Sequence, residues 1–151
     1  MKRIDGRGVR AASAVKRGPI LYVEDESDNY SVVELRLGSR YRFLWAQSDA
    51  EAISLLEQHG GELLAILMDI QLQGSTLDGI ELTKAIRDIH PRATSPLGAV
   101  PVIERVPIIF VTGCIGKYSA DELKSSGGNA MVGKPIDFRE LGMVLDHFVT
   151  D

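Results

Sequence analysis

The chain has 151 residues with a formal net charge of −4; 44% of its residues are apolar, 25% are charged, and it holds one cysteine. This length and near-average composition predict one globular domain, and they exclude wholesale disorder, collagen-like repeats and a disulfide scaffold. The longest apolar run, Leu63–Met68, is far shorter than the ~18 residues of a membrane span. The amino terminus also lacks the apolar segment of a secretory signal, so we expect a soluble, cytoplasmic protein.

Charge is distributed unevenly along the chain. The first 17 residues hold six Lys or Arg against one Asp, a net charge of +5, so the remainder carries −9. We expect residues 1–17 to form a disordered basic arm and residues 18–151 to form the folded domain. A basic arm could contact nucleic acid or an anionic membrane surface, but the acidic domain itself is not expected to bind nucleic acid.

From Pro19 onward, short apolar runs alternate with amphipathic segments. The runs are nearly continuous, which is typical of parallel strands covered on both faces. They predict strands at Ile20–Val23, Tyr41–Ala46, Leu63–Met68, Val106–Val111 and Ala130–Val132. Caps and apolar spacing predict a helix after each strand, from Ser27 to Leu37, Ser48 to His59, Gly79 to Ile89, Ser119 to Gly127 and Asp137 to Phe148.

Two of these helices begin with the spacing of a capping box, in which Ser48 and Ser119 are each followed by Glu three positions later. Five β–α repeats imply a doubly wound α/β fold, with a parallel sheet, right-handed crossovers and helices on both faces. The connection at residues 90–105 is longer than the usual ~2–6 residues, so it is an insertion or a mobile loop.

Polar residues follow four of the predicted strands. They are Glu24, Asp25 and Glu26 after the first, Asp69 after the third, Thr112 and Gly113 after the fourth, and Lys134 and Pro135 after the fifth. Ligands of open α/β sheets bind at the carboxyl ends of the strands, so we expect these groups to meet in one site. Taken singly, each has a plain structural explanation, such as a loop acid at the start of a helix. Together, the clustered carboxylates would repel one another, and oxygen ligands without His or Cys suit a hard cation such as Mg²⁺.

Five motifs resemble, in order, those of the receiver domains of two-component response regulators. They are Ile20–Asp25, Leu67–Asp69, Asp78-Gly79, Val111–Gly113 and Lys134-Pro135, and the resemblance runs from about residue 18 to residue 150. It implies a flavodoxin-like (βα)5 fold with a five-stranded parallel sheet of strand order 2-1-3-4-5, an order known from a chemotaxis receiver. It also implies a signalling phosphoacceptor rather than an enzyme.

The resemblance implies a role for each site residue. Asp69 would accept a phosphoryl group from a phosphohistidine on a sensor histidine kinase or a histidine phosphotransfer protein, and the domain would then act on a downstream protein target. The expected cofactor is Mg²⁺, and its ligands would be Glu24, Asp25, Asp69 and the backbone carbonyl of Gln71. Thr112 and Lys134 would stabilise the transferring oxygens, and the Lys134-Pro135 bond would be cis.

Besides the long connection at residues 90–105, the chain departs from the family pattern at two places. The loop between Asp69 and Asp78 is two residues longer than usual, and Gln73 or Gly74 stands where a proline is common. Met131 occupies a position that is normally aromatic, where the ring changes place on phosphorylation. Trp45 is expected in the core, too distant from the acids to report metal binding.

Two other function classes stay open. One is a pseudo-receiver, an interaction module that never carries phosphate; its usual mark is the loss of an acid or the lysine, and none is missing here. The other is a phosphatase of the haloacid-dehalogenase type, with an aspartate nucleophile. That class would have a second acid two residues after the nucleophile, where this chain has Gln71.

Overall fold

The computed structural model describes residues 18–89, 98–113 and 115–149. The predicted disordered arm, residues 1–17, lies outside the described residues, as does the part of the 90–105 connection that comprises residues 90–97. Among the helices of the described ranges, none combines the length and the apolar character needed to cross a membrane.

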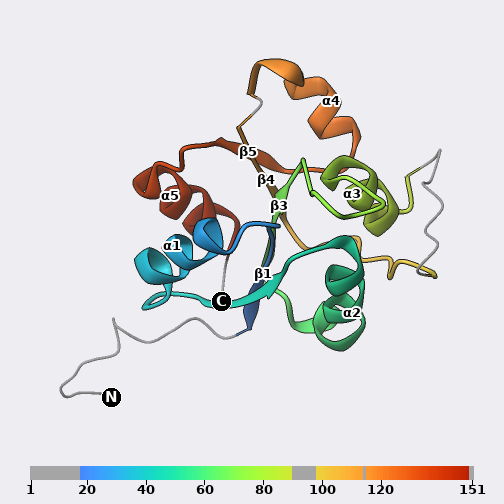
Figure 1. The fold of residues 1–151 in the computed structure, drawn as a ribbon, viewed down its shortest axis with the longest axis horizontal. Coiled ribbons are helices and arrows are strands. Elements are labelled where there is room, and N and C mark those ends of the chain that lie inside the picture. The colour runs from blue at the N-terminus through green and yellow to red at the C-terminus, as the bar shows by residue number, and fades with distance from the viewer. Residues whose placement is uncertain (1–17, 90–97, 114, 150–151) are drawn as a thin grey trace.

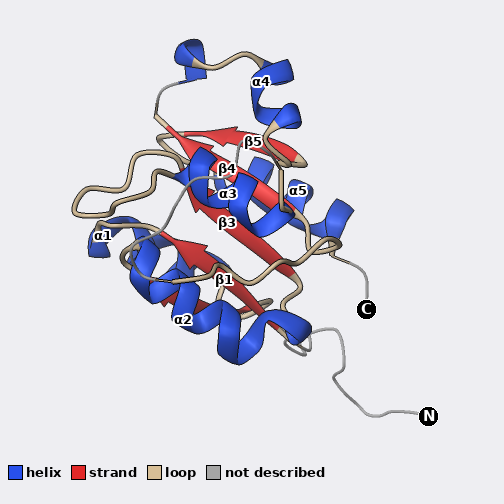
Figure 2. Ribbon diagram, turned by 90° about the vertical axis from the view of Figure 1, so that its right-hand side faces the viewer, coloured by secondary structure: helices blue, strands red, loops and turns tan. Residues whose placement is uncertain are grey.

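Five parallel strands form one sheet in the order β2-β1-β3-β4-β5, which confirms the predicted order. Their bounds are β1 Pro19–Val23, β2 Arg42–Ala46, β3 Ala65–Asp69, β4 Ile108–Thr112 and β5 Ala130–Gly133. Figure 2 shows the strands as red arrows that point the same way, behind α2 and α3. Their carboxyl ends therefore lie along one edge.

Helices cover both faces of the sheet. Their bounds are α1 Ser27–Leu37, α2 Asp49–His59, α3 Gly79–Arg87, α4 Ala120–Ser125 and α5 Phe138–Phe148, with short 3₁₀ turns η3 Gly60–Glu62 and η4 Ile115–Lys117. Helices α1 and α5 pack on one face, and α2, α3 and α4 lie on the other (Figure 1). Each face has its own apolar core, as the continuous apolar strands predict.

The helix starts follow the predicted caps with one difference. Ser119 and Glu122 form the complete capping box expected at α4. At α2, Ser48 accepts a hydrogen bond from the Glu51 N–H, but the Glu51 carboxylate accepts from Gln47 instead of Ser48, so only half of the predicted box forms.

The connection after α3 is partly packed against the domain. Helix α3 ends at Arg87, two residues before the predicted end, because Asp88 adopts a left-handed conformation with φ of 57°. Beyond the undescribed residues, Val100 is buried in the core, and the Ile103 N–H donates to the Ile86 carbonyl at 2.8 Å. The described end of this connection, residues 98–105, is therefore anchored on α3.

Candidate functional site

A cavity of about 300 Å³ lies at the carboxyl edge of the sheet. Its lining residues are Asp25, Glu26, Asn29, Asp69, Gln71, Gln73, Thr112, Gly113 and Lys134. All but Asn29, which lies on α1, come from the ends of β1, β3, β4 and β5 or from the loops that follow them, because all strands of a parallel sheet end at the same edge. The structure thus brings the predicted site residues together, with Glu24 buried directly behind the cavity.

Three carboxylates form a compact cluster at this edge. One oxygen from each of Glu24, Asp25 and Asp69 lies within 4.8 Å of the others. Glu24 is completely buried and Asp69 is 5% exposed, whereas Asp25 is half-buried at the cavity wall. Because buried carboxylates lose their hydration, such a cluster requires positive charge or hydrogen-bond donors nearby.

Lys134 supplies the positive charge. Its Nζ donates to Glu24 Oε1 at 2.8 Å and to Asp69 Oδ2 at 2.9 Å, so one ammonium bridges two of the acids. The Lys134 N–H donates to the Thr112 carbonyl at 2.9 Å, which ties the end of β5 to the end of β4. The Lys134-Pro135 peptide bond is cis, as the resemblance implied.

Glu24 has further partners that the sequence did not indicate. Its Oε1 accepts from the Tyr22 hydroxyl at 3.2 Å, and its Oε2 accepts from the Glu26 N–H at 3.0 Å. Tyr22 is completely buried two positions earlier on β1, so both side chains project from the same face of the strand. That spacing of two is the signal that could have identified Tyr22.

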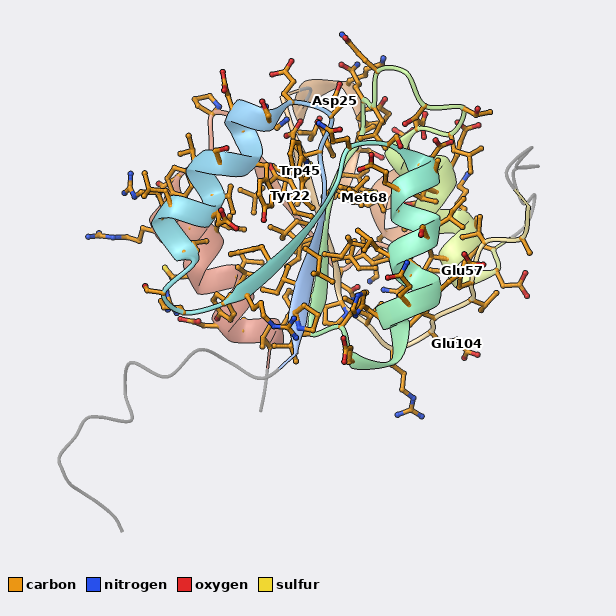
Figure 3. The ribbon with its side chains drawn as sticks, turned by 60° about the horizontal axis from the view of Figure 1, so that its bottom comes forward. Tyr22, Asp25, Trp45, Glu57, Met68 and Glu104 are labelled. Carbon is orange, nitrogen blue, oxygen red and sulfur yellow. The ribbon has the colours of Figure 1, made fainter. Side chains whose placement is uncertain are left out.

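Trp45 lies closer to the acids than predicted. Its indole Nε1–H donates to the Glu24 carbonyl at 2.8 Å, and its ring stacks on Tyr30 with centroids 4.8 Å apart. Figure 3 shows Tyr22 and Trp45 between β1 and α1, beside Asp25 at the strand's end. The expectation that Trp45 lies far from the acids is therefore wrong, and its side chain is half-buried and packs against the core.

The Asp78-Gly79 pair positions the backbone of Asp69. A Cβ added at Gly79 would lie 2.0 Å from the Asp69 carbonyl oxygen, so only glycine allows α3 to begin this close to the end of β3. Asp78 caps α3 in a complete capping box with Glu81. Gly79 is therefore required for steric reasons, and Asp78 is explained by its hydrogen bonds at the start of α3.

Burial raises the pKa of Asp69 and of Glu24 above their ordinary values, and the hydrogen bonds from Lys134 offset this only in part. Burial alone would lower the pKa of Lys134, but its hydrogen bonds to Glu24 and Asp69 outweigh that effect and raise it. Burial and the adjacent Glu24 also raise the pKa of Tyr22. With three carboxylates against one ammonium, the cluster favours binding of protons or of a cation.

The donor set fits Mg²⁺, which prefers carboxylate and carbonyl oxygens. Two ligands on opposite sides of one Mg²⁺ are at most about 4.2 Å apart, given metal–oxygen distances of about 2.1 Å. The carboxylate oxygens here lie within 4.8 Å of one another, so all three could hold the ion after a small approach, or with one of them bound to it through a water. Gln71, the predicted carbonyl ligand, lines the cavity, and its N–H donates to the Asp69 carboxylate.

Thr112 and Gly113, the remaining predicted residues, also line the cavity. Thr112 ends β4 beside Asp69 and is 1% exposed. Gly113 is exposed, and an added Cβ would meet nothing closer than the Lys134 Cβ at 3.9 Å. These two residues therefore give the cavity a hydroxyl and an unobstructed backbone position.

The chain matches known receiver domains in sequence and in structure. The sequence profile of the response regulator receiver domain matches residues 20–146. The polar-differentiation response regulator DivK of Brucella ovis is 30% identical over 118 residues, which cover 78% of this chain and 84% of DivK.

Solved structures show the same fold. The receiver domain of the sensor histidine kinase PA1611 from Pseudomonas aeruginosa has a TM-score of 0.68 and 30% identity over 87% of this chain and 96% of its own; that structure holds a magnesium ion in its active site cleft. NtrX from Brucella abortus has a TM-score of 0.70 and 23% identity; the match covers 88% of this chain but 27% of the NtrX chain.

Proposed function

Because this chain belongs to the receiver domain family of response regulators, which act in two-component signalling, we propose that Asp69 is its phosphoacceptor. The observation that carries the proposal is the position of Asp69 at the end of β3, the central strand. Its carboxylate borders the cavity, is bound by Lys134 and lies among the other acids of the cluster. No other acid in the described residues combines these features.

The proposed reaction is transfer of a phosphoryl group from a phosphohistidine. A carboxylate oxygen of Asp69 attacks the phosphorus, the P–N bond breaks, and the imidazole leaves as an aspartyl phosphate forms. Lys134 places a positive charge beside the transferring oxygens, and the Thr112 hydroxyl donates a hydrogen bond to them. Gly113 leaves the approach open.

Glu24, Asp25, Asp69 and the carbonyl of Gln71 would hold Mg²⁺. When bound, this ion supplies most of the positive charge that phosphoryl transfer requires. The protein then acts as a switch that carries the phosphoryl group. The donor of this group is a sensor histidine kinase or a histidine phosphotransfer protein. This step is stoichiometric rather than the turnover of an enzyme.

Phosphorylation from a small-molecule donor tests the proposal. Incubation with acetyl phosphate and Mg²⁺ should add one phosphoryl group by intact mass, and Asp69→Asn should abolish the addition. Asp28→Asn is a matched control, because Asp28 is an exposed acid on α1 outside the cluster. Unlabelled wild-type protein would favour the pseudo-receiver, and a labelled Asp69→Asn variant would move the phosphoacceptor elsewhere.

Magnesium titration tests the ligand set separately. Trp45 is the single tryptophan and bonds the backbone of Glu24, so its fluorescence should change as Mg²⁺ binds. Asp25→Ala should weaken binding strongly, whereas Glu57→Ala on the outer surface of α2 should leave it unchanged (Figure 3). An unaltered affinity in Asp25→Ala would place the metal elsewhere.

A further inference from the structure

Asp49 is a buried acid for which the proposed chemistry has no use. Of the acids buried among the described residues, Glu24 and Asp69 belong to the site, and Asp49, 3% exposed, begins α2 outside it. Its Oδ2 accepts from the N–H groups of Thr76 at 3.0 Å and Leu77 at 2.9 Å. Its own N–H donates to the Ser75 hydroxyl at 2.9 Å. Asp49 therefore binds three successive residues of one loop.

That loop, residues 70–78, joins β3 to α3 and borders the cavity. Its ends meet where the Gly79 N–H donates to the Ile70 carbonyl at 2.7 Å, and Leu72 and Leu77 anchor it in the core. Gln71 and Gln73 line the cavity. The Gln73 N–H donates to Asp25 Oδ2 at 3.0 Å, so the loop holds an acid of the cluster directly.

We propose that Asp49 is a positioning residue for the metal site, an inference that rests on the proposed function. By fixing residues 75–77 against α2, it sets the positions of Gln71 and Gln73, whose N–H groups donate to Asp69 and Asp25, and thereby the position of the Gln71 carbonyl. Asp49 itself bonds to neither of these acids.

The composition of the loop explains why it needs such an anchor. No proline restricts its backbone, and Gly74, with φ of 80°, is free to adopt many other conformations in an unanchored chain. Two hydrogen bonds to a buried carboxylate limit that freedom before any ligand binds. Less ordering then has to accompany binding, which increases affinity.

Substitutions at both ends of this contact test the proposal through Mg²⁺ affinity. Asp49→Ala should weaken Mg²⁺ binding about tenfold, a loss typical of residues that orient metal ligands. Asp49→Asn, which keeps one oxygen acceptor, should restore part of the loss. Ser75→Ala removes only one contact and should give a smaller loss in a protein that folds normally. Amide exchange at Thr76 and Leu77 should accelerate in Asp49→Ala.

Ser48→Ala is the matched control. Ser48 caps the same helix through the Glu51 N–H and takes no part in the hydrogen bonds from Asp49 to the loop, so its loss should lower the unfolding midpoint without changing Mg²⁺ affinity. Folded Asp49 and Ser75 variants with wild-type affinity would overturn the positioning role alone. A wild-type protein that binds no Mg²⁺ would overturn both this role and the proposed metal site. Acetyl phosphate labelling reports separately on Asp69.

Discussion

At the scale of single residues, Glu24 shows how the fold keeps a completely buried carboxylate ionisable. Its two oxygens accept from the Tyr22 hydroxyl, the Lys134 ammonium and the Glu26 N–H. Hydrogen bonds to a charged group are worth about 1.5–3 kcal/mol each, and they fix the orientation of the carboxylate as well as its charge. Of these three donors, only the Tyr22 hydroxyl can be removed by substitution without changing the charge of the site or the backbone.

Tyr22→Phe is therefore expected to act on the metal site. The ring stays in the core, but Glu24 loses a donor that orients it, so Mg²⁺ affinity should fall about tenfold. The free energy of unfolding should fall by about 1–2 kcal/mol. Titration monitored by Trp45 fluorescence and urea unfolding measure these effects. Tyr30→Phe removes a hydroxyl bonded to Glu34 on α1, and it should leave Mg²⁺ affinity unchanged.

The raised pKa values of Asp69 and Glu24 predict an unusual pH dependence of stability in metal-free protein. The folded state holds these protons more tightly than the unfolded chain, so their contribution to the free energy of unfolding falls as pH rises. The fall begins near the ordinary carboxyl pKa and ends above the raised values, and each tenfold difference in proton affinity between the two states contributes about 1.4 kcal/mol to it. Lys134, with its raised pKa, contributes a change only in the alkaline range, above its ordinary value.

Asp69→Asn isolates this effect. The variant should gain stability relative to wild type as pH rises from about 4 to 8, because it has no buried carboxylate to ionise at this position. Urea unfolding with a chelator across that range measures the difference. Saturating Mg²⁺ should stabilise the wild type at neutral pH by binding the folded state, and it should reduce its pH dependence. A difference between the two proteins that does not vary with pH would contradict the assigned cause.

At the scale of elements, Arg87 in the last turn of α3 joins segments far apart in the chain. Its guanidinium donates to the carbonyls of Gly127, Ile103, Glu104 and Val106 and to the Asn129 side chain. It thereby fastens the end of the 90–105 connection and the turn between α4 and β5 to one helix. Burial lowers the pKa of Arg87 below its ordinary value, yet arginine stays charged at neutral pH.

Arg87→Ala should lower the free energy of unfolding by about 2–4 kcal/mol, because several partly buried carbonyls lose their donor. Arg87→Lys should recover only part of this, since a lysine lacks the planar fork that reaches several acceptors at once. Urea unfolding measures both losses. Arg139→Ala, an exposed site on α5, should change stability by less than about 0.5 kcal/mol. An equally small change in Arg87→Ala would show that the five hydrogen bonds contribute little.

The contrast between Asp69 and Arg87 explains how much the sequence could predict. Parallel strands are recognisable as apolar runs, so the five strands and the acid at the end of β3 follow from local pattern, whereas the strand order came from the family resemblance. The partners of Arg87 are mostly backbone carbonyls, which every residue has and which therefore leave no mark in a sequence. The hydrogen bonds that Asp49 accepts from the N–H groups of Thr76 and Leu77 join residues more than 25 positions apart, beyond the reach of any local signal.

At the scale of the whole molecule, the sheet separates two apolar cores, and its strands contribute side chains to both. The candidate site lies at the edge of the sheet where these strands end. We therefore expect a change at Asp69 to reach the outer surface by two routes. One is the loop at residues 71–77, which contacts Asp25. The other is β5 and α4, where Met131 is half-buried opposite Phe110 of β4.

We expect Met131 to limit the second route. A phosphoryl group shifts a conformational equilibrium only as far as its interaction free energy differs between the two states. An aromatic ring with two defined positions can provide such a difference. Met131 is unbranched, fills space in several rotamers and has no hydroxyl to anchor it. It lines a surface cavity with Leu123, Gly128 and Ala130, so space beside it is available without moving α4.

We therefore expect the response to phosphorylation to be concentrated in the loops of the candidate site. With beryllofluoride and Mg²⁺ as a mimic of the aspartyl phosphate, amide chemical-shift changes should be largest in residues 71–77 and 113–118 and small across residues 119–133. Met131→Tyr offers the matched comparison: restoring an aromatic ring should enlarge the response of α4 and β5 while leaving that of the loops unchanged. A rearrangement of residues 119–133 in the wild type as large as that of the loops would contradict this prediction, because a methionine would then be sufficient to couple the two sides of the molecule.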